Sequence, residues 1–157
     1  FAIVEAGSNP YELTDELESL RAKGVEPVFV SGSFVEILEH IAERLGVEHV
    51  LATRLLQAGG KYTGRFEAPQ TIGQGKATAI GAFLAGRDTQ AADCWAFGDD
   101  ISDLPMLNAV GHPVAVIGDS ALGAVARDRG WRCLHLSASD EQTLIRSNLS
   151  ALVGATM

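Results

Sequence analysis

The stretch CWAFGDDISDLPML, residues 94–107, decides the fold of this chain. An apolar run of β-forming residues leads into an acidic loop, and a short apolar helix over residues 102–108 follows. Parallel sheets present their ligand-binding loops at the carboxyl ends of buried strands, ahead of the next helix. The stretch therefore predicts one strand of an α/β domain with a functional loop at its end.

The same alternation of apolar runs and helical patterns continues along the rest of the chain. The expected strands cover residues 26–31, 94–98, 113–117 and 132–136, and the expected helices cover residues 34–45, 75–84 and 121–129. Residues 1–4 are apolar enough for an additional strand, followed by a helix over residues 10–23. We expect a doubly wound, mostly parallel, Rossmann-like sheet in a single domain over residues 1–157, with residues 137–157 as a terminal helix or tail.

Residues 49–66 show a different pattern, in which apolar runs flank Gly59-Gly60. This pattern predicts a β-hairpin that projects from the main sheet, near the mouth of the site. Arg54 in this segment is a candidate contact for an anionic substrate. Exposed basic residues on a hairpin are most often only solvated, so both roles stay open for Arg54.

Composition and charge limit the classes of partner. A formal net charge of −8 over 157 residues argues against nucleic acid and against an anionic membrane surface, because the mean field repels phosphate groups. The sequence shows no apolar stretch of about 18 residues and no basic-then-apolar leader. We expect a cytoplasmic protein.

Two candidate phosphate-binding features follow the first expected strands. Ser31-Gly32-Ser33 offers a hydroxyl and successive backbone N–H groups, which suit an anion, although the same triplet is also an ordinary helix-capping turn. Lys76 begins a helix, where the positive end of the helix dipole disfavours a cation. A lysine placed against that preference indicates a functional role or a solvated surface position.

The third feature is the acidic loop itself. Asp99, Asp100 and Asp103 place three carboxylates within five residues, and such carboxylates repel one another unless a cation or solvent separates them. Hard oxygen ligands suit Mg²⁺. Asp99 and Asp103 are the candidate metal ligands, and Asp100 is a candidate helix cap.

In this order, the hydroxyl, the lysine and the acidic loop resemble the haloacid dehalogenase superfamily, specifically its phosphoserine-phosphatase-like branch. The resemblance runs from about residue 27 to residue 133, and its most specific part is GDDISDLPML. Further matching stretches are VSGSF (30–34), AERLGV (42–47), ATR (52–54), YTG (62–64) and VGHPVAV (110–116). Agreement over this length points to common ancestry.

The resemblance implies a role for each candidate residue. Ser31 would hydrogen-bond a phosphoryl oxygen, with Gly32 and Ser33 completing the cradle, and Lys76 would offset the charge of nucleophile and phosphate. Asp99 would ligate Mg²⁺, and Asp103 would ligate the ion or orient its water. The implied reaction is hydrolysis of a small phosphorylated metabolite.

The family's aspartate nucleophile, in an Asp-x-Asp motif after the first strand, is missing from this sequence. In one explanation residues 1–4 form the central strand and Glu5 stands near the nucleophile position as a degenerate remnant. In the other the chain is N-terminally truncated and lacks both its cap and the strand that bears the nucleophile. A missing central strand would also favour a homo-oligomer.

The function expected from the sequence is therefore a Mg²⁺-dependent phosphomonoester hydrolase, weak or inactive in this chain. The main alternative is a non-catalytic relative that binds a phosphorylated ligand or a partner protein through the same scaffold. A more distant alternative is a response-regulator-like or nucleotide-binding domain. The hairpin and the position of Lys76 late in the chain fit such a domain less well.

Overall fold

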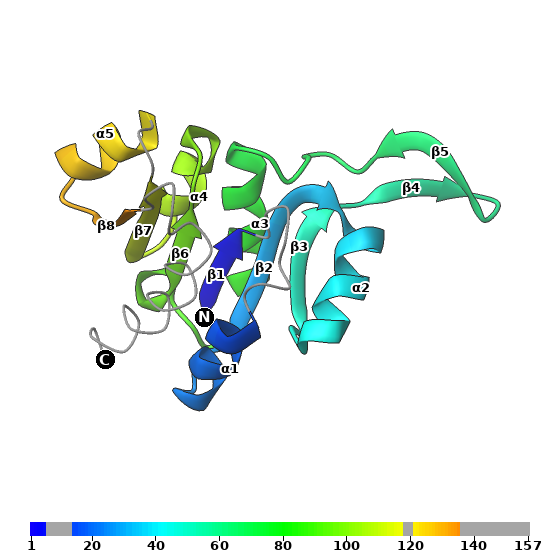
Figure 1. Ribbon diagram of the computed structural model, residues 1–157. Helices are drawn as coiled ribbons and strands as arrows, with labels where there is room; N and C mark the ends of the chain where they lie inside the picture. Colours follow the sequence, from blue (N-terminus) through cyan, green and yellow to red (C-terminus); the bar gives the residue numbers. More distant parts are fainter. Residues whose placement is uncertain (6–13, 118–120, 136–157) are drawn as a thin grey trace.

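A parallel six-stranded sheet forms the centre of the protein, in the strand order β3-β2-β1-β6-β7-β8 (Figure 1). The structure is a computed structural model that describes residues 1–5, 14–117 and 121–135. The strands are β1 (Ala2–Glu5), β2 (Pro27–Phe34), β3 (His49–Thr53), β4 (Leu55–Ala58), β5 (Lys61–Phe66), β6 (Trp95–Gly98), β7 (His112–Ile117) and β8 (Arg132–His135). The helices are α1 (Thr14–Ala22), α2 (Val35–Leu45), α3 (Gln74–Leu84), α4 (Leu104–Asn108) and α5 (Ala121–Asp128), with short 3₁₀ turns at Ala91–Asp93 and Ile101–Asp103.

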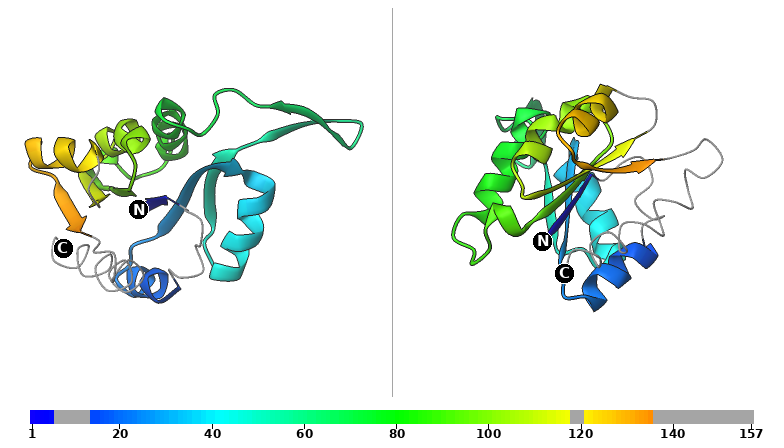
Figure 2. Two further views of the ribbon diagram at one scale, coloured as in Figure 1. Left: turned by 45° about the horizontal axis from the view of Figure 1, so that its top comes forward. Right: turned by 90° about the vertical axis from the view of Figure 1, so that its left-hand side faces the viewer.

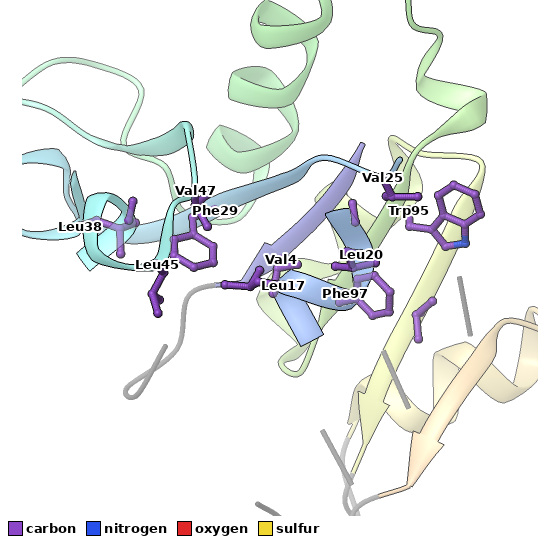
Figure 3. Packing of buried hydrophobic residues seen from close by; sticks show 13 residues of the cluster. Val4, Leu17, Leu20, Val25, Phe29, Leu38, Leu45, Val47, Trp95 and Phe97 are labelled. Carbon is purple, nitrogen blue, oxygen red and sulfur yellow. The ribbon is translucent and has the colours of Figure 1, made fainter. Parts of the chain in front are cut away.

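The helices form a layer on each face of the sheet (Figure 2). The first face packs against α1 and α2, through a cluster that includes Leu17, Leu38 and Leu45 (Figure 3). The second packs against α3, α4 and α5, through a cluster that includes Ile80, Met106 and Leu122. This three-layer arrangement confirms the predicted doubly wound fold.

Alternation along the strands separates the two cores. In β1, Val4 belongs to the first cluster and Ile3 to the second, as expected for side chains with a period of two. In β6, Phe97 and Ala96 divide in the same way. Both faces of the sheet are apolar, which explains why its strands read as continuous apolar runs in the sequence.

Helix α2 shows how local sequence sets an element. Leu38, Ala42 and Leu45 recur at helical spacing and are buried. Gly46 ends the helix in the left-handed conformation, with φ of 63°, which only glycine adopts without steric cost. The following Val47 N–H donates to the Ala42 carbonyl at 2.8 Å, so the last turn is closed and the chain turns toward β3.

One predicted boundary is wrong. The segment 49–66 is not a single hairpin, because β3 pairs in parallel with β2 and forms an edge of the main sheet. Only β4 and β5 pair antiparallel, and they project away from the sheet (Figure 1). Val50, Leu51 and Ala52 pack against the two cores, which holds this part of the segment in the main sheet.

The first strand takes the central position. Strand β1 pairs in parallel with β2 on one side and with β6 on the other. This arrangement agrees with the explanation that places residues 1–4 in the centre of the sheet. The beginning of the expected helix 10–23 and the expected tail 137–157 lie outside the described residues.

Among the residues that the structure describes, none of the helices has both the length and the apolar character needed to cross a bilayer.

Candidate active site

The predicted site residues meet at the carboxyl ends of β1, β2 and β6. The register pairs Glu5 with Val30, next to Ser31, and pairs Val4 with Phe97, one residue before Gly98. Chain connections run outward from this point in both directions along the sheet, first to β2 and β3 and later to β6, β7 and β8. Ligands of open α/β sheets bind at such a switch point.

Lys76 lies in the first turn of α3 and is buried, with 6% of its surface exposed. Its Nζ donates to Asp103 Oδ1 at 2.6 Å and to Glu5 Oε2. Burial lowers the pKa of Lys76, but the bonds to Asp103 and Glu5 outweigh it, so the pKa lies above its ordinary value. The lysine is therefore a fixed, buried cation and not a solvated surface residue.

Asp103 connects the lysine to the acidic loop. Its side chain is 1% exposed; Oδ1 accepts from Lys76, while Oδ2 accepts from the N–H groups of Asp99 at 3.1 Å and Asp100 at 3.3 Å. Gly98 makes room for this carboxylate, because a Cβ at Gly98 would lie 2.7 Å from the Asp103 Cβ. Asp103 thus holds both the loop backbone and the Lys76 ammonium group in place.

Asp99 and Asp100 differ in their surroundings. Although Asp99 is exposed, its carboxyl group is shielded enough that desolvation raises its pKa, and the negative charge of Asp103 raises it further. Asp100 Oδ1 accepts from the Ser102 N–H at 2.8 Å, a bond that lowers the pKa of Asp100 and caps the turn that leads into α4. Of the two, Asp99 is the carboxylate available to a cation.

The Ser31-Gly32-Ser33 triplet lies in the last part of β2. Ser31 is buried, and its Oγ accepts from the Ser33 N–H at 3.2 Å. The pairing of β2 with β3 is irregular between Ser31 and Phe34, so the strand bends here before α2 begins. The predicted cradle therefore adjoins Glu5 and its lysine through the β1–β2 pairing.

Glu5 stands at the carboxyl end of the central strand, the position that one explanation of the missing nucleophile gave it. It is half-buried, and this burial raises its pKa, although the bond to Lys76 acts in the opposite direction. Glu5 is therefore the carboxylate nearest in sequence and strand position to where the family has its nucleophile.

Arg54, the candidate contact for an anionic substrate, is exposed at the base of the hairpin. The structure does not bring it into the cluster of Lys76, Glu5 and Asp103.

Thr53 is a site residue that the sequence reasoning missed. It is 1% exposed, and its hydroxyl donates to the Gly32 carbonyl at 3.3 Å while accepting from the Thr71 N–H at 3.1 Å. The available signal was a polar residue at the end of a strand next to the Ser31 strand, but its two partners are backbone groups distant in sequence. Nothing in local spacing identifies them.

Another group of side chains that could ligate a metal lies at the opposite ends of the strands. The ligand atoms of Glu26, Glu48 and His49 lie within 4.8 Å of one another. His49 Nε2 is 3.0 Å from Glu26 Oε1, and the His49 ring packs edge-on against Phe1 and Phe83. The histidine side chain thus already contacts the Glu26 carboxylate, apart from the Lys76 cluster.

Comparison with known proteins identifies the family. The model for haloacid dehalogenase-like hydrolases matches residues 2–108. The chain belongs to this family. A probable phosphatase of Mycobacterium tuberculosis is 41% identical over 126 residues, covering 80% of this chain and 44% of the relative. A phosphoserine phosphatase of the same organism is 33% identical over 119 residues, covering 75% of this chain and 39% of the relative.

Solved structures agree with this placement. A protein of unknown function from Bordetella pertussis Tohama I superposes with a TM-score of 0.70 at 28% identity, covering 78% of this chain and 56% of that protein. Together with the curated relatives, such matches place the chain in the phosphoserine-phosphatase-like branch of the haloacid dehalogenase family. The chain spans about 44% of the length of the first curated relatives that it matches.

The acidic loop of this family member fits a hard divalent cation. Asp99 offers an exposed carboxylate beside the charge of Asp103. Desolvation raises the pKa of Asp99 most, the charge of Asp103 raises it further, and a bound cation would offset that charge. Both oxygens of Asp103 already accept hydrogen bonds from the lysine and the loop. The donor set therefore suits direct ligation by Asp99, with Asp103 in a supporting position.

Proposed function

We propose that this chain acts as a Mg²⁺-dependent phosphomonoester hydrolase on a small phosphorylated metabolite. The observation that carries the proposal is Lys76, a buried ammonium group held between Glu5 and Asp103 at the carboxyl ends of the strands. A buried cation beside a phosphoryl group offsets negative charge more strongly than a solvated one, because little water screens it.

Each residue has a distinct task in this proposal. The Ser31 hydroxyl and the backbone N–H of Gly32 bind the phosphoryl oxygens, and the Ser33 N–H, which donates to Ser31 Oγ in the structure, turns to the phosphoryl group when it is bound. Lys76 offsets the charge of these oxygens. Asp99 would hold a magnesium ion, which would supply charge stabilisation to the phosphoryl group. Asp103 holds the acidic loop and Lys76 in place through its hydrogen bonds. These bonds fit the role of orienting a metal-bound water better than the role of ligating Mg²⁺ directly.

Glu5 limits the rate in this proposal. The family's aspartate nucleophile is replaced in this position by a side chain one methylene longer, which displaces the carboxylate by about 1 Å and costs on the order of 10²-fold in rate. The Glu5 carboxylate is also engaged by Lys76, and its raised pKa reflects burial. We therefore propose weak hydrolysis by the chain itself.

The relatives support the reaction class of the proposal. They include proteins named as a probable phosphatase, phosphoserine phosphatases and a histidinol-phosphatase. The phosphoserine phosphatase and histidinol-phosphatase names refer to phosphomonoesters of small molecules, and a net charge of −8 disfavours nucleic-acid phosphates as substrates. A small phosphorylated metabolite is thus the substrate class that we propose.

Hydrolysis of an aryl phosphate by the purified chain, with and without Mg²⁺, tests the proposal. Turnover should require Mg²⁺, and Asp99→Asn should lower it by about 10²-fold or more, since metal ligation is lost. Asp128→Asn, an exposed aspartate at the end of α5, is the matched control and should leave turnover unchanged.

Phosphate binding without Mg²⁺-dependent turnover would instead support the non-catalytic alternative. Glu5→Asp separates the two further, because a shortened carboxylate should raise turnover if the chain is a weak hydrolase. A binding protein would show no gain.

A further inference from the structure

The hydroxyl of Thr53 joins the end of β2 to the loop ahead of α3, and these two segments meet at the proposed phosphate site. It donates to the carbonyl of Gly32, in the Ser31-Gly32-Ser33 cradle, and accepts from the N–H of Thr71. Thr53 is 1% exposed and Thr71 is 4% exposed, so water does not readily replace the bond from the Thr71 N–H, whereas the bond to the Gly32 carbonyl is only partly buried. A buried backbone N–H that loses its partner is costly, which makes this hydroxyl important for the position of Thr71.

The Thr71 loop leads directly into the lysine helix. The N–H of Gly75 donates to the Ile72 carbonyl at 2.9 Å, and the N–H of Lys76 donates to the Gly73 carbonyl at 3.1 Å. The backbone between Thr71 and Lys76 is therefore a closed series of turns. A shift of Thr71 would be passed on to the start of α3.

The end of β2 and the loop ahead of α3 also contact each other without the Thr53 hydroxyl. A Cβ at Gly32 would lie 3.0 Å from Cγ1 of Ile72 and 3.7 Å from the Thr71 carbonyl oxygen. The Ser31-Gly32-Ser33 cradle and the loop ahead of α3 are thus in close packing contact at the point that Thr53 bridges. The missing side chain of Gly32 and the Thr53 hydroxyl together set the distance between these two segments.

We propose that Thr53 is a positioning residue that holds the Ser31-Gly32-Ser33 cradle in register with Lys76. This inference rests on the proposed function of the site as a phosphate-binding site. Thr53 acts through the Gly32 carbonyl and the Thr71 N–H. A hydroxyl is needed because the position must both donate and accept, which a valine of the same shape cannot do.

The experiment compares Thr53→Val with Thr53→Ser and uses two readouts in the full chain. The first is the hydrogen exchange rate of the Thr71 amide, measured by NMR. The second is the affinity for inorganic phosphate, together with the KM and kcat for an aryl phosphate. Thr63→Val is a matched control, because the Thr63 hydroxyl also donates to a carbonyl, that of Leu56 at 3.1 Å, and accepts from the N–H of Arg65 at 3.3 Å, but on the exposed hairpin.

In Thr53→Val we expect Thr71 exchange at least about tenfold faster and phosphate affinity about tenfold weaker, as loss of a buried hydrogen bond predicts. KM should rise more than kcat falls, since the cradle binds the phosphoryl group. Thr53→Ser should stay within about twofold of the wild type in both readouts, and Thr63→Val should leave both unchanged.

Equal behaviour of the valine and serine variants, in either direction, would overturn the inference, because the hydroxyl would then not be the active feature. Should Thr53→Val not fold, Thr53→Ala removes the same hydroxyl without the second methyl group and is compared with serine in its place. Absence of phosphate binding in the wild-type chain would contradict the proposed function, whereas the Thr71 exchange rate tests the bridge by itself.

Discussion

The cluster around Lys76 and the β4–β5 hairpin both carry polar and charged side chains, yet the two regions differ in what surrounds those side chains. Lys76 and Asp103 are 6% and 1% exposed and bond to each other. Every residue of β5 is exposed, including Tyr62 at 58%. Charged side chains at a protein surface carry a small desolvation cost and constrain the structure little. Buried charged side chains are tolerated only with defined hydrogen-bond or ion-pair partners.

This difference explains why the two regions have different expected sensitivities to substitution. In the cluster Lys76 is the shared hydrogen-bond partner of Glu5 and Asp103, so removing it leaves both carboxylates without a cation in a site shielded from water. On the hairpin the side chains face solvent, which replaces whatever a substitution removes. Matched substitutions in the two regions measure how large that difference in sensitivity is.

The largest effect is expected for Lys76→Met, which leaves the Glu5 and Asp103 carboxylates near each other without their cation. Breaking a buried charge pair in this way should lower the free energy of unfolding by about 3–5 kcal/mol. Denaturant unfolding measures this loss. Lys61→Met on the hairpin is the matched control, and a loss below about 1 kcal/mol for Lys76→Met would mean that the cluster is as tolerant as the hairpin.

A smaller loss is expected for Gly75→Ala in the first turn of α3. A Cβ at this position would lie 1.7 Å from the Gln70 carbonyl oxygen, so the backbone ahead of the lysine must move. We expect the free energy of unfolding to fall by about 2–3 kcal/mol, as for an overpacked core.

Gly81→Ala is the control within the same helix, because its Cβ would meet nothing within 4 Å. It should stabilise the protein by about 0.5–1 kcal/mol through helix propensity. Thermal unfolding of the two variants checks the pair. Similar shifts for both would show that the crowding at Gly75 is relieved without cost.

The smallest effects are expected on the hairpin. Tyr62→Ser should change the free energy of unfolding by no more than about 0.5 kcal/mol, because the ring is largely solvated. Arg54→Gln should be equally neutral for stability, and its KM for a phosphomonoester should change by no more than about threefold. A tenfold rise in KM would instead make Arg54 a substrate contact and join the hairpin to the site.

The sequence was most informative where burial follows a regular period. The helical spacing of Ile37, Leu38, Ile41 and Leu45, closed by Gly46, predicted α2 nearly to the residue, although Ile37 is 55% exposed. The apolar run before Asp99 predicted β6 and the start of its loop. These patterns reflect local geometry, which each residue shares with its near neighbours in the chain.

The sequence was less informative where partners are distant in the chain. The segment 49–66 was assigned to one hairpin because half-buried β3 and exposed β4 have similar compositions, and only pairing with β2 separates them. Local spacing likewise could not show that Asp103 uses both oxygens within the protein, or that Thr53 has two backbone partners. Such contacts depend on the assembled sheet.

Strand β1 also has a consequence for how the molecule is made. Its central position requires pairing with β6, and the register joins Ala2 to Trp95. A growing chain must therefore release most of the described residues before the middle of its sheet can close, and the edge of β1 that pairs with β6 stays unpaired until then. Closing the sheet joins residues far apart in the chain, so slow folding is expected of this topology.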